Sequence, residues 1–425
     1  MPRTPLRRRP PVHPLLLEVE RTQGAAPALD SLRSGLAQAS GPLREPAEAG
    51  TTALTFVWIG EAPQVSLQCG LVDHGNSSSM HRMPGTDVWV LEAIAPDDTL
   101  VSYRYVVDDP FLGTGQLDDA GWQRLMLAAQ ERSFADPHNP DRLPPLASLF
   151  GLAVAEEQWE SVLSLPEAPD SHWFAAAEGA TGSFERFEHV SAAMGDARDI
   201  TVYLTPGPPV PRPLVVLLDG PSWLAIADLP RAIDTAVRDG EIEAPIVAFV
   251  HEARGSNGLV DRVRELSCNR QHARMLADEL IPFLHSRYRV AGDERTVVGG
   301  ASLGGLASMF TAVEHPHVVR NVLSISGSFW YGLERDGRPE WLTRQLAERP
   351  VTPRRVYQQI GRFEDGPLSL SPGVSHLDAN RNFRDAATAM GIDLTYEEMG
   401  TAHDIAAFRI AAMRGLRTLL GTSSR

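Results

Sequence analysis

The chain has 425 residues, of which 43% are hydrophobic and 22% charged, and its formal net charge is −15. Such a composition is ordinary for a globular protein with more than one core, and the negative charge argues against nucleic acid as a partner. All 39 basic residues are arginine, which excludes Schiff-base, Walker-lysine and Ser-Lys chemistry, and without an apolar run of about 18 residues we expect no membrane span.

The first segment, residues 1–49, is rich in Pro, Ala, Arg and Gly. Its basic start is followed by prolines and lacks the long apolar stretch of a secretory signal. We predict a disordered or partly helical leader, with a short helix near residues 29–39, on a cytoplasmic protein. Only two cysteines occur, Cys69 and Cys268, far apart in sequence, and this pattern is typical of a reducing compartment.

Residues 50–140 contain short alternating apolar segments that are broken by Gly, Asn, Asp and Pro. This pattern predicts a small all-β sandwich. The predicted strands are residues 54–59, 65–69, 87–92 and 101–107. Turn-forming residues at 136–140 mark a boundary, and we predict a linker with one short helix over residues 141–190.

Residues 191–425 alternate between apolar strands and amphipathic helices, a pattern that predicts a doubly wound, mostly parallel α/β sheet. The predicted strands are residues 198–204, 214–218, 245–250, 295–299, 322–325, 355–360 and 393–399. The clearest predicted helices are residues 271–287, the segment after residue 305, and the segment from about residue 405.

A nucleophile elbow is predicted at residues 300–304, with the sequence Gly-Ala-Ser-Leu-Gly. A β-branched strand precedes these residues and a helix follows them, which is the context that the Gly-x-Ser-x-Gly motif requires. Ser302 is therefore the predicted nucleophile. The backbone amide of Leu303 is the predicted first donor to an oxyanion.

A serine nucleophile needs a base, and in α/β-hydrolases the acid and then the histidine follow the serine in the chain. His403 lies between the last strand and the last helix, where that base belongs. Glu364 and Asp365 follow the strand at 355–360, and only one of these neighbouring side chains can reach His403. We favour Glu364; the alternative is that both carboxylates cap a turn and that the enzyme uses a Ser–His dyad.

The second oxyanion donor is expected in the loop after the strand at 214–218. The amides of Ser222 and Trp223 are candidates, whereas Pro221 has no N–H. We expect the Trp223 indole to form a pocket wall rather than part of the core. Residues 254–274 carry five arginines against two acidic residues, so they form either a solvated helix face or a site for an anionic ligand.

Further motifs surround these positions. They are Asp219-Gly220-x-x-Trp223, Arg262-x-x-Glu265-Leu266-x-Cys268-Asn269, Gly300-x-Ser302-x-Gly304-Gly305, Ser326-Gly327-Ser328-x-Trp330, Gly361-x-x-Glu364 and His403-Asp404. Together with Ser79-Met80-x-Arg82-Met83-x-Gly85-Thr86-Asp87-Val88-Trp89 in the sandwich, they resemble the enterochelin (enterobactin) esterases over about residues 50–420. Thr401 and Ala402 stand where that family usually has two glycines, and Phe408 stands where it often has Trp.

The resemblance implies a serine esterase that opens the trilactone backbone of ferric catecholate siderophores in the cytoplasm. It implies no cofactor, since iron enters only with the substrate. We expect a monomer or a weak homo-oligomer, although the sequence does not determine the oligomeric state. Arginine suits both anion pairing and stacking on catechol rings. Arg262 is the main candidate for ligand contact and Arg264 a weaker one. Asn269 is assigned to the ligand or to a helix cap, Glu265 to an ion pair, and Trp223 and Trp330 to the catechol rings.

Two other functions remain open from the sequence. One is a general carboxylesterase of the esterase D or feruloyl type, which would share the elbow. The other is a siderophore-binding protein on an inactive hydrolase fold, against which the intact Ser302, His403 and Glu364 argue. Neither the particular siderophore nor the number of ester bonds cut follows from the sequence.

Overall fold

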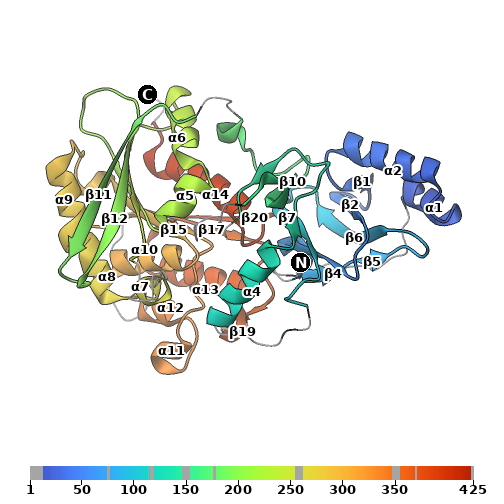
Figure 1. Cartoon of the computed structure of the whole chain (residues 1–425). Coiled ribbons are helices and arrows are strands. Elements are labelled where there is room, and N and C mark those ends of the chain that lie inside the picture. Colours follow the sequence, from blue (N-terminus) through green and yellow to red (C-terminus); the bar gives the residue numbers. More distant parts are fainter. Residues whose placement is uncertain are drawn as a thin grey trace. The chain divides into compact units, whose positions relative to one another are not determined.

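The computed structural model describes residues 13–73, 77–112, 114, 119–145, 154–175, 179–253, 262–346, 355–368 and 371–422. The chain forms two compact units, coloured along the sequence in Figure 1. The N-terminal unit comprises Met1–Pro169 with Arg362–Gly366 and Met399–Ala407, and the C-terminal unit comprises Asp170–Gly361, Pro367–Glu398 and Phe408–Arg425. Over the described ranges, no helix is both long and apolar enough to cross a membrane.

The N-terminal unit contains two antiparallel sheets. The first has the order β1-β2-β6-β5, formed by β1 (Leu43–Pro46), β2 (Thr51–Ile59), β6 (Val88–Pro96) and β5 (His81–Arg82). The second has the order β4-β3-β7-β10-β9, formed by β4 (Ser77–Ser79), β3 (Val65–Cys69), β7 (Leu100–Val107), β10 (Glu160–Ser164) and β9 (Arg142–Leu143). The all-β sandwich predicted before the hydrolase is thereby confirmed.

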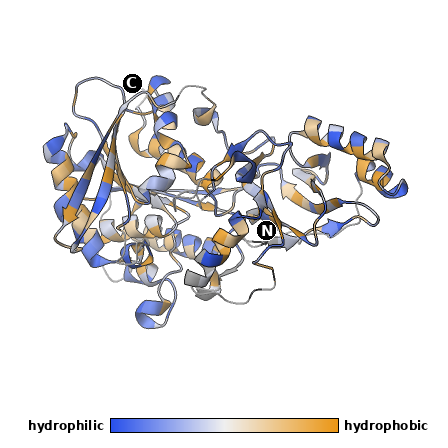
Figure 2. Cartoon of the chain, viewed as in Figure 1, coloured by the Kyte–Doolittle hydropathy of each residue, from blue (hydrophilic) through white to orange (hydrophobic). Residues whose placement is uncertain are grey.

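Successive side chains of β6 point to opposite faces of the first sheet, so this strand contributes to two apolar cores. Trp89 and Leu91 join a core shared by strands of both sheets, whereas Val88 and Val90 join a second core with the N-terminal helices. Those helices are α1 (Pro14–Arg21) and α2 (Ala26–Ala39), which cover the outer face of the first sheet (Figure 1). Figure 2 shows polar and apolar residues interleaved along both helices, as expected for helices with one buried side.

Part of the segment that was predicted as a linker, residues 141–190, belongs to the sandwich. Residues 160–164 form β10, which pairs antiparallel with β7, and Val162 and Leu163 are buried. The short remaining elements of this unit are α3 (Gly70–Asp73), α4 (Asp119–Gln130), β8 (Ser133–Phe134) and the 3₁₀ turn Glu156–Gln158. Sequence patterning missed β10 because it is short and its partner strand is about 60 residues earlier.

The C-terminal unit is built on one eight-stranded sheet of order β11-β12-β14-β13-β15-β16-β17-β20. Its strands are β11 (Ser183–Ser191), β12 (Asp196–Leu204), β13 (Leu214–Leu217), β14 (Ile246–Val250), β15 (Thr296–Ala301), β16 (Asn321–Ile325), β17 (Arg355–Gly361) and β20 (Asp393–Met399). The strands from β14 through β13, β15 and β16 to β17 are parallel, and β11 and β12 add an antiparallel edge. The α/β fold class is therefore confirmed; β11, inside the predicted linker, was missed.

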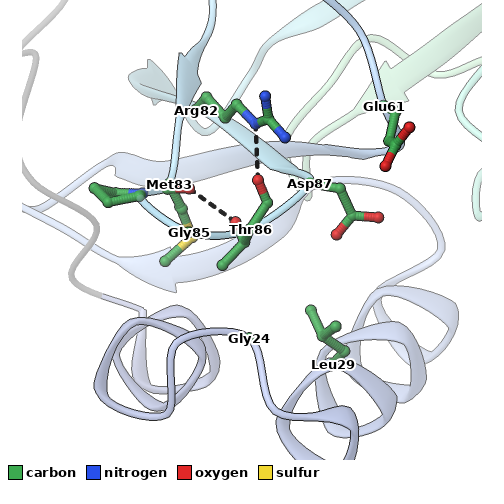
Figure 3. A pocket seen from close by; sticks show the side chains of 9 residues that line it. Gly24, Leu29, Glu61, Arg82, Met83, Gly85, Thr86 and Asp87 are labelled. Carbon is green, nitrogen blue, oxygen red and sulfur yellow. Dashed lines mark hydrogen bonds between the residues drawn. The ribbon is translucent and has the colours of Figure 1, made fainter.

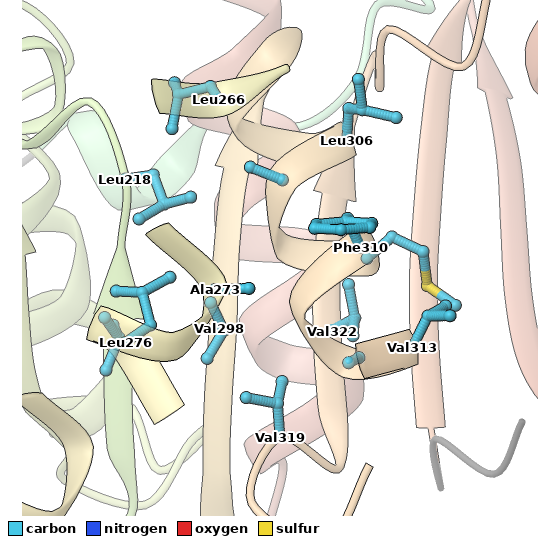
Figure 4. Close-up of a cluster of buried hydrophobic side chains, with 14 of the residues drawn as sticks. Leu218, Leu266, Ala273, Leu276, Val298, Leu306, Phe310, Val313, Val319 and Val322 are labelled. Carbon is cyan, nitrogen blue, oxygen red and sulfur yellow. The ribbon is translucent and has the colours of Figure 1, made fainter. Parts of the chain in front are cut away.

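Helices cover both faces of this sheet. Val322 and Val356 pack in a core with α10 (Leu303–Glu314) and α13 (His376–Ala389), part of which is shown in Figure 4. The next residue on each strand points the other way, and Leu323 and Tyr357 approach Gly415 of α14 (Ile405–Leu420). The other helical segments are the 3₁₀ turn His172–Phe174, α5 (Gly220–Ala225), α6 (Leu229–Arg238), α7 (Arg262–Leu266), α8 (Arg270–Arg274), a π-helical segment (Met275–Leu280), α9 (Ile281–Arg287), the 3₁₀ turn Asp293–Arg295, α11 (Leu333–Asp336) and α12 (Trp341–Leu346); β18 (Pro367–Leu368) and β19 (Ser371–Ser375) form a small hairpin.

The helix predicted over residues 271–287 is realised as three consecutive helical segments, α8, a π-helical turn and α9. Pro282 has no N–H to donate to the carbonyl of Asp278, so the α-helical ladder is interrupted there, and the wider turn accommodates the proline.

Candidate active site

Ser302 occupies the predicted elbow. It follows β15 directly and is the N-cap residue of α10, with φ 59° and ψ −122°. A serine rarely adopts positive φ, and such a conformation costs about 1–3 kcal/mol unless its surroundings enforce it. Here the Ser302 amide donates to the Ile325 carbonyl at 2.9 Å, and the Ser328 amide donates to the Ser302 carbonyl at 3.0 Å.

Close packing explains the glycines of the elbow. A Cβ atom at Gly300 would lie 2.9 Å from the carbonyl carbon of Gly304, so strand and helix can approach only without that side chain. The Ser302 hydroxyl lies 3.2 Å from the hydroxyl of Ser328. Leu303 is the first residue of α10, so its amide lies outside the intrahelical ladder, at the positive end of the helix dipole.

His403 and Glu364 form a direct pair. Nδ1 of His403 lies 2.6 Å from Oε2 of Glu364. Because a carboxylate only accepts, this contact assigns the proton to Nδ1, and in the neutral imidazole Nε2 is then the nitrogen without a proton, as a general base requires. The Glu364 side chain is 3% exposed and that of His403 is 38% exposed, so the pair has a shielded acid and an accessible imidazole. Of the two carboxylates considered, the structure pairs Glu364 with the imidazole.

Trp223 corrects one prediction. The side chain is 1% exposed, and its indole N–H donates to the carbonyl of Leu218 at 2.7 Å. It is therefore part of the core, so the indole is neither a pocket wall nor a stacking surface for a catechol ring. The residue lies inside α5, and the Ser222 amide already donates to the Asp219 carbonyl at 3.0 Å. Gly220 is the first residue of α5, and the first amides of a helix have no partner within that helix.

Arg262 does not stand alone as a ligand-binding cation. Its Nη2 donates to Oδ2 of Asp219 at 2.9 Å, and its Nε donates to Oδ1 of the same carboxylate, which makes a bidentate pair. Burial opposes ionisation of Asp219, but the charge and hydrogen bonds of Arg262 outweigh it and lower the pKa of Asp219. The Arg262 side chain keeps 34% exposure, so its outer edge is still open to a ligand.

Glu252 completes a cluster that sequence reasoning missed. Burial, and then the neighbouring Asp219 carboxylate, raise the pKa of Glu252 to about 9, so Glu252 is protonated near neutral pH and hydrogen-bonds to Asp219. Asp219 also lies against the elbow helix, because a Cβ atom at Gly304 would be 2.8 Å from its Oδ2. The available signal was position: Asp219 and Glu252 both lie within two residues of the carboxyl ends of β13 and β14.

The other predicted ligand residues divide into two groups. Asn269 caps α8, because its side-chain oxygen accepts from the backbone amides of Gln271 at 2.8 Å and His272 at 3.3 Å. Its side-chain NH₂ group donates to the Arg264 carbonyl. The helix cap predicted for Asn269 is therefore confirmed, and its side-chain oxygen is occupied by the cap rather than by a ligand. Arg264 keeps a side chain that is 49% exposed, and Trp330 is half-buried beside the main core.

Glu265 is an ion-pair partner, as predicted. It is buried and pairs with Arg198 at 2.9 Å and 3.2 Å. Arg254 of the cationic segment lies outside the described residues.

A separate hollow of about 600 Å³ lies in the N-terminal unit, between the α1–α2 connection and the turn between β5 and β6 (Figure 3). Its lining includes Glu61, Arg82 and Asp87, with the Arg82 guanidinium held by the carbonyl of Thr86 at 2.7 Å. It contains none of the residues predicted for catalysis.

Comparison with known proteins finds two family models that match successive parts of the chain. Residues 191–419 match the family described as putative esterase, and residues 53–174 match the family described as enterochelin esterase, N-terminal. The chain is 26% identical to an iron(III) enterobactin esterase of Dickeya dadantii, over 89% of this chain and 90% of the relative. It is also 26% identical to an iron(III) salmochelin esterase of Escherichia coli, over 96% of this chain and 98% of the relative.

Solved structures show the same fold. The ferric enterobactin esterase of Salmonella typhimurium superposes with a TM-score of 0.74 at 21% identity, covering 89% of this chain and 96% of that one. The enterobactin esterase of Shigella flexneri in the presence of enterobactin gives a TM-score of 0.70 at 21% identity, with the same coverage. With an esterase domain over more than half of its length and the matching N-terminal domain before it, the chain belongs to the enterochelin esterase family.

Proposed function

We propose that this protein is a serine esterase that hydrolyses the trilactone backbone of a ferric catecholate siderophore, with Ser302 as nucleophile, His403 as general base and Glu364 as the acid that orients it. The observation that carries the proposal is the elbow, where Ser302 is held at positive φ between a strand and a helix. The paired His403 and Glu364, and relatives named as iron(III) enterobactin and salmochelin esterases, support it.

The chemistry follows from these groups. Nε2 of His403 takes the proton of the Ser302 hydroxyl as Oγ attacks the ester carbonyl carbon, and Glu364 stabilises the resulting imidazolium. The Leu303 amide stabilises the oxyanion of the tetrahedral intermediate. The intermediate collapses by breaking the C–O ester bond, and the leaving alkoxide takes the proton from His403. Water then attacks the acyl-serine by the same sequence, which releases a carboxylic acid and restores Ser302.

The substrate class follows from charge and shape. A ferric tris-catecholate is a trianion with aromatic faces, for which arginine is suited. Arg264 and the open edge of Arg262 are the proposed anion contacts, and Trp330 is the proposed aromatic contact. In this proposal the chain needs no cofactor, iron enters as substrate, and the protein acts in the cytoplasm as a monomer or weak homo-oligomer. Cys69 and Cys268, which are both buried and unpaired, support a reducing compartment.

Mass spectrometry of the products from a panel of ferric tri-catecholate lactones tests this function. We expect wild-type protein to give linearised products that gain one water for each ester bond cut, and we expect Ser302→Ala to give none while it still binds the ferric ligand. Turnover of simple aryl esters with none of any ferric lactone would show a general carboxylesterase instead. Wild-type turnover by Ser302→Ala would show that the nucleophile is wrong.

A further inference from the structure

The loops that carry Glu364 and His403 belong to the N-terminal unit. In the chain they follow β17 and β20 of the large sheet, yet Arg362–Gly366 and Met399–Ala407 cluster with the sandwich. The Leu100 amide, at the start of β7, donates to the Gly400 carbonyl at 2.9 Å. The two loops also hold each other, because the Phe363 amide donates to the Thr401 carbonyl at 3.0 Å.

Ala402 anchors the loop that carries His403, Met399–Ala407, in the core of the sandwich. It is 3% exposed and belongs to the apolar core formed between the two sheets. A methyl group added at Gly70, directly after β3, would lie 2.2 Å from the Cβ atom of Ala402. That distance is far below van der Waals contact. Ala402, one residue before His403, can therefore occupy this position only because Gly70 has no side chain.

Asp404, the residue after His403, holds the same loop through backbone hydrogen bonds. Its carboxylate accepts from the Ser102 amide of β7 at 3.2 Å and from the Ala407 amide at 2.9 Å. Burial raises the pKa of Asp404 to about 7, with smaller contributions in the same direction from Glu160 and Glu364. Glu160 itself accepts from the Ser102 hydroxyl at 2.9 Å. An ion pair between Asp98 and Arg362 holds the loop that carries Glu364 near the start of β7.

We propose that the β-sandwich domain positions the catalytic acid–base pair, with Ala402 seated against Gly70 and Asp404 bonded to Ser102 on either side of His403. This inference rests on the proposed function, which gives His403 and Glu364 their roles. Ala402 and Asp404 are positioning residues that act through His403. The N-terminal domain therefore contributes to kcat for every ester, including one too small to use the siderophore contacts.

Gly70→Ala in the full chain tests this inference. The added methyl group displaces Ala402, and a displacement near 1 Å at a catalytic group costs on the order of a hundredfold in rate. We expect kcat to fall by about ten- to a hundredfold on both p-nitrophenyl acetate and a ferric tri-catecholate lactone, with KM changed by less than about threefold. A KM increase at unchanged kcat would overturn the proposal.

The double variant Gly70→Ala/Ala402→Gly is the matched rescue. It removes the clashing Cβ atom, after which the closest remaining atom, Cα of residue 402, lies 3.7 Å away in ordinary contact. We expect kcat to return to within about threefold of wild type. If the double variant is folded by circular dichroism but remains as slow as Gly70→Ala, the steric argument is wrong.

Asp404→Asn gives a second measurement that does not depend on Gly70. Asparagine offers one acceptor oxygen where the carboxylate has two, so one backbone amide loses its partner. We expect kcat to fall by about tenfold with KM retained, and the deficit to widen above pH 7, where Asp404 of the wild type is ionised. The groups that face Asp404 are Glu160, Glu364 and Cys69. A deficit that is constant across pH would contradict the role of the carboxylate.

Asp109→Asn is the matched control in the same domain. Asp109 is also a buried carboxylate, which accepts from the Ser66 hydroxyl and from the Phe111 amide at 2.9 Å, beyond the opposite end of β7. We expect it to lower thermal stability without lowering kcat, and an equal kcat loss would overturn the positioning role. The proposed function fails separately: its failure would appear as absent turnover of ferric lactones by wild type, or as unchanged ester hydrolysis by His403→Ala.

Discussion

Replacing Glu364 by glutamine should nearly abolish catalysis while leaving the shape of the site intact. The carboxylate accepts the Nδ1 proton of His403 at 2.6 Å and is 3% exposed, so the bond is short, charge-assisted and shielded from solvent. Glutamine removes the charge and can donate its own N–H to Nδ1, which moves the imidazole proton to Nε2. Nε2 could then no longer accept the Ser302 proton. The corresponding aspartate-to-asparagine change in a serine protease of another fold lowers kcat by about 10⁴, equivalent to about 5.4 kcal/mol.

The assay is steady-state hydrolysis of p-nitrophenyl acetate across pH, together with the rate of Ser302 labelling by a fluorophosphonate. Asp365→Asn is the matched control, since it removes a neighbouring carboxylate from the same loop. We expect kcat of the control to stay within about threefold of wild type and KM of both variants to change little. The reasoning is refuted if Glu364→Gln retains near wild-type kcat, or if Asp365→Asn loses as much.

The other predictions concern the elbow and the cluster behind it. Gly300→Ala should reduce stability by about 1–3 kcal/mol and lower kcat, because its Cβ atom would lie 2.9 Å from the Gly304 backbone; thermal denaturation and ester hydrolysis measure both, and an unchanged melting temperature would contradict the packing. Arg262→Ala should slow hydrolysis of a small neutral ester as well as weaken siderophore binding, because Asp219 loses its partner; a loss confined to siderophore binding would restore the role predicted from sequence. Glu252 binds a proton in the folded state up to about pH 9 but only to about pH 4.5 when unfolded, so the wild type should lose stability between those pH values, by up to about 1.4 kcal/mol per unit. Urea denaturation of Glu252→Gln should lack this slope, and an identical slope in the variant would disprove the assignment.

Local patterns were sufficient to predict the elbow and the strand-end loops. The Gly-x-Ser-x-Gly motif between an apolar strand and a helix places Ser302, and a histidine between the last strand and the last helix marks His403. These inferences depend only on residues adjacent in sequence and on the rule that parallel strands present their carboxyl ends at one edge. For the same reason the segments 65–69 and 393–399 were predicted with the bounds that the structure gives.

The features that the sequence did not predict depend on contacts between residues that are far apart in the chain. Trp223 follows the turn-forming segment 219–222 and precedes four apolar residues, so its neighbours in sequence do not decide between a loop and the core; the bond from its indole to the Leu218 carbonyl shows that the indole is buried. The Asp219–Arg262 pair joins residues 43 positions apart, which no periodicity encodes. The helix predicted near residues 29–39 is confirmed as α2, but α1 was not predicted, and both helices pack against the apolar outer face of a sheet formed later in the chain.

The most direct test of the account is peptide mapping by mass spectrometry after a fluorophosphonate reacts with the full-length protein. We predict one adduct, on Ser302, formed rapidly in the wild type and slowed by at least about a hundredfold in His403→Ala. An adduct on another residue, or a labelling rate that does not depend on His403, would contradict the assignment of Ser302 as a serine activated by that imidazole.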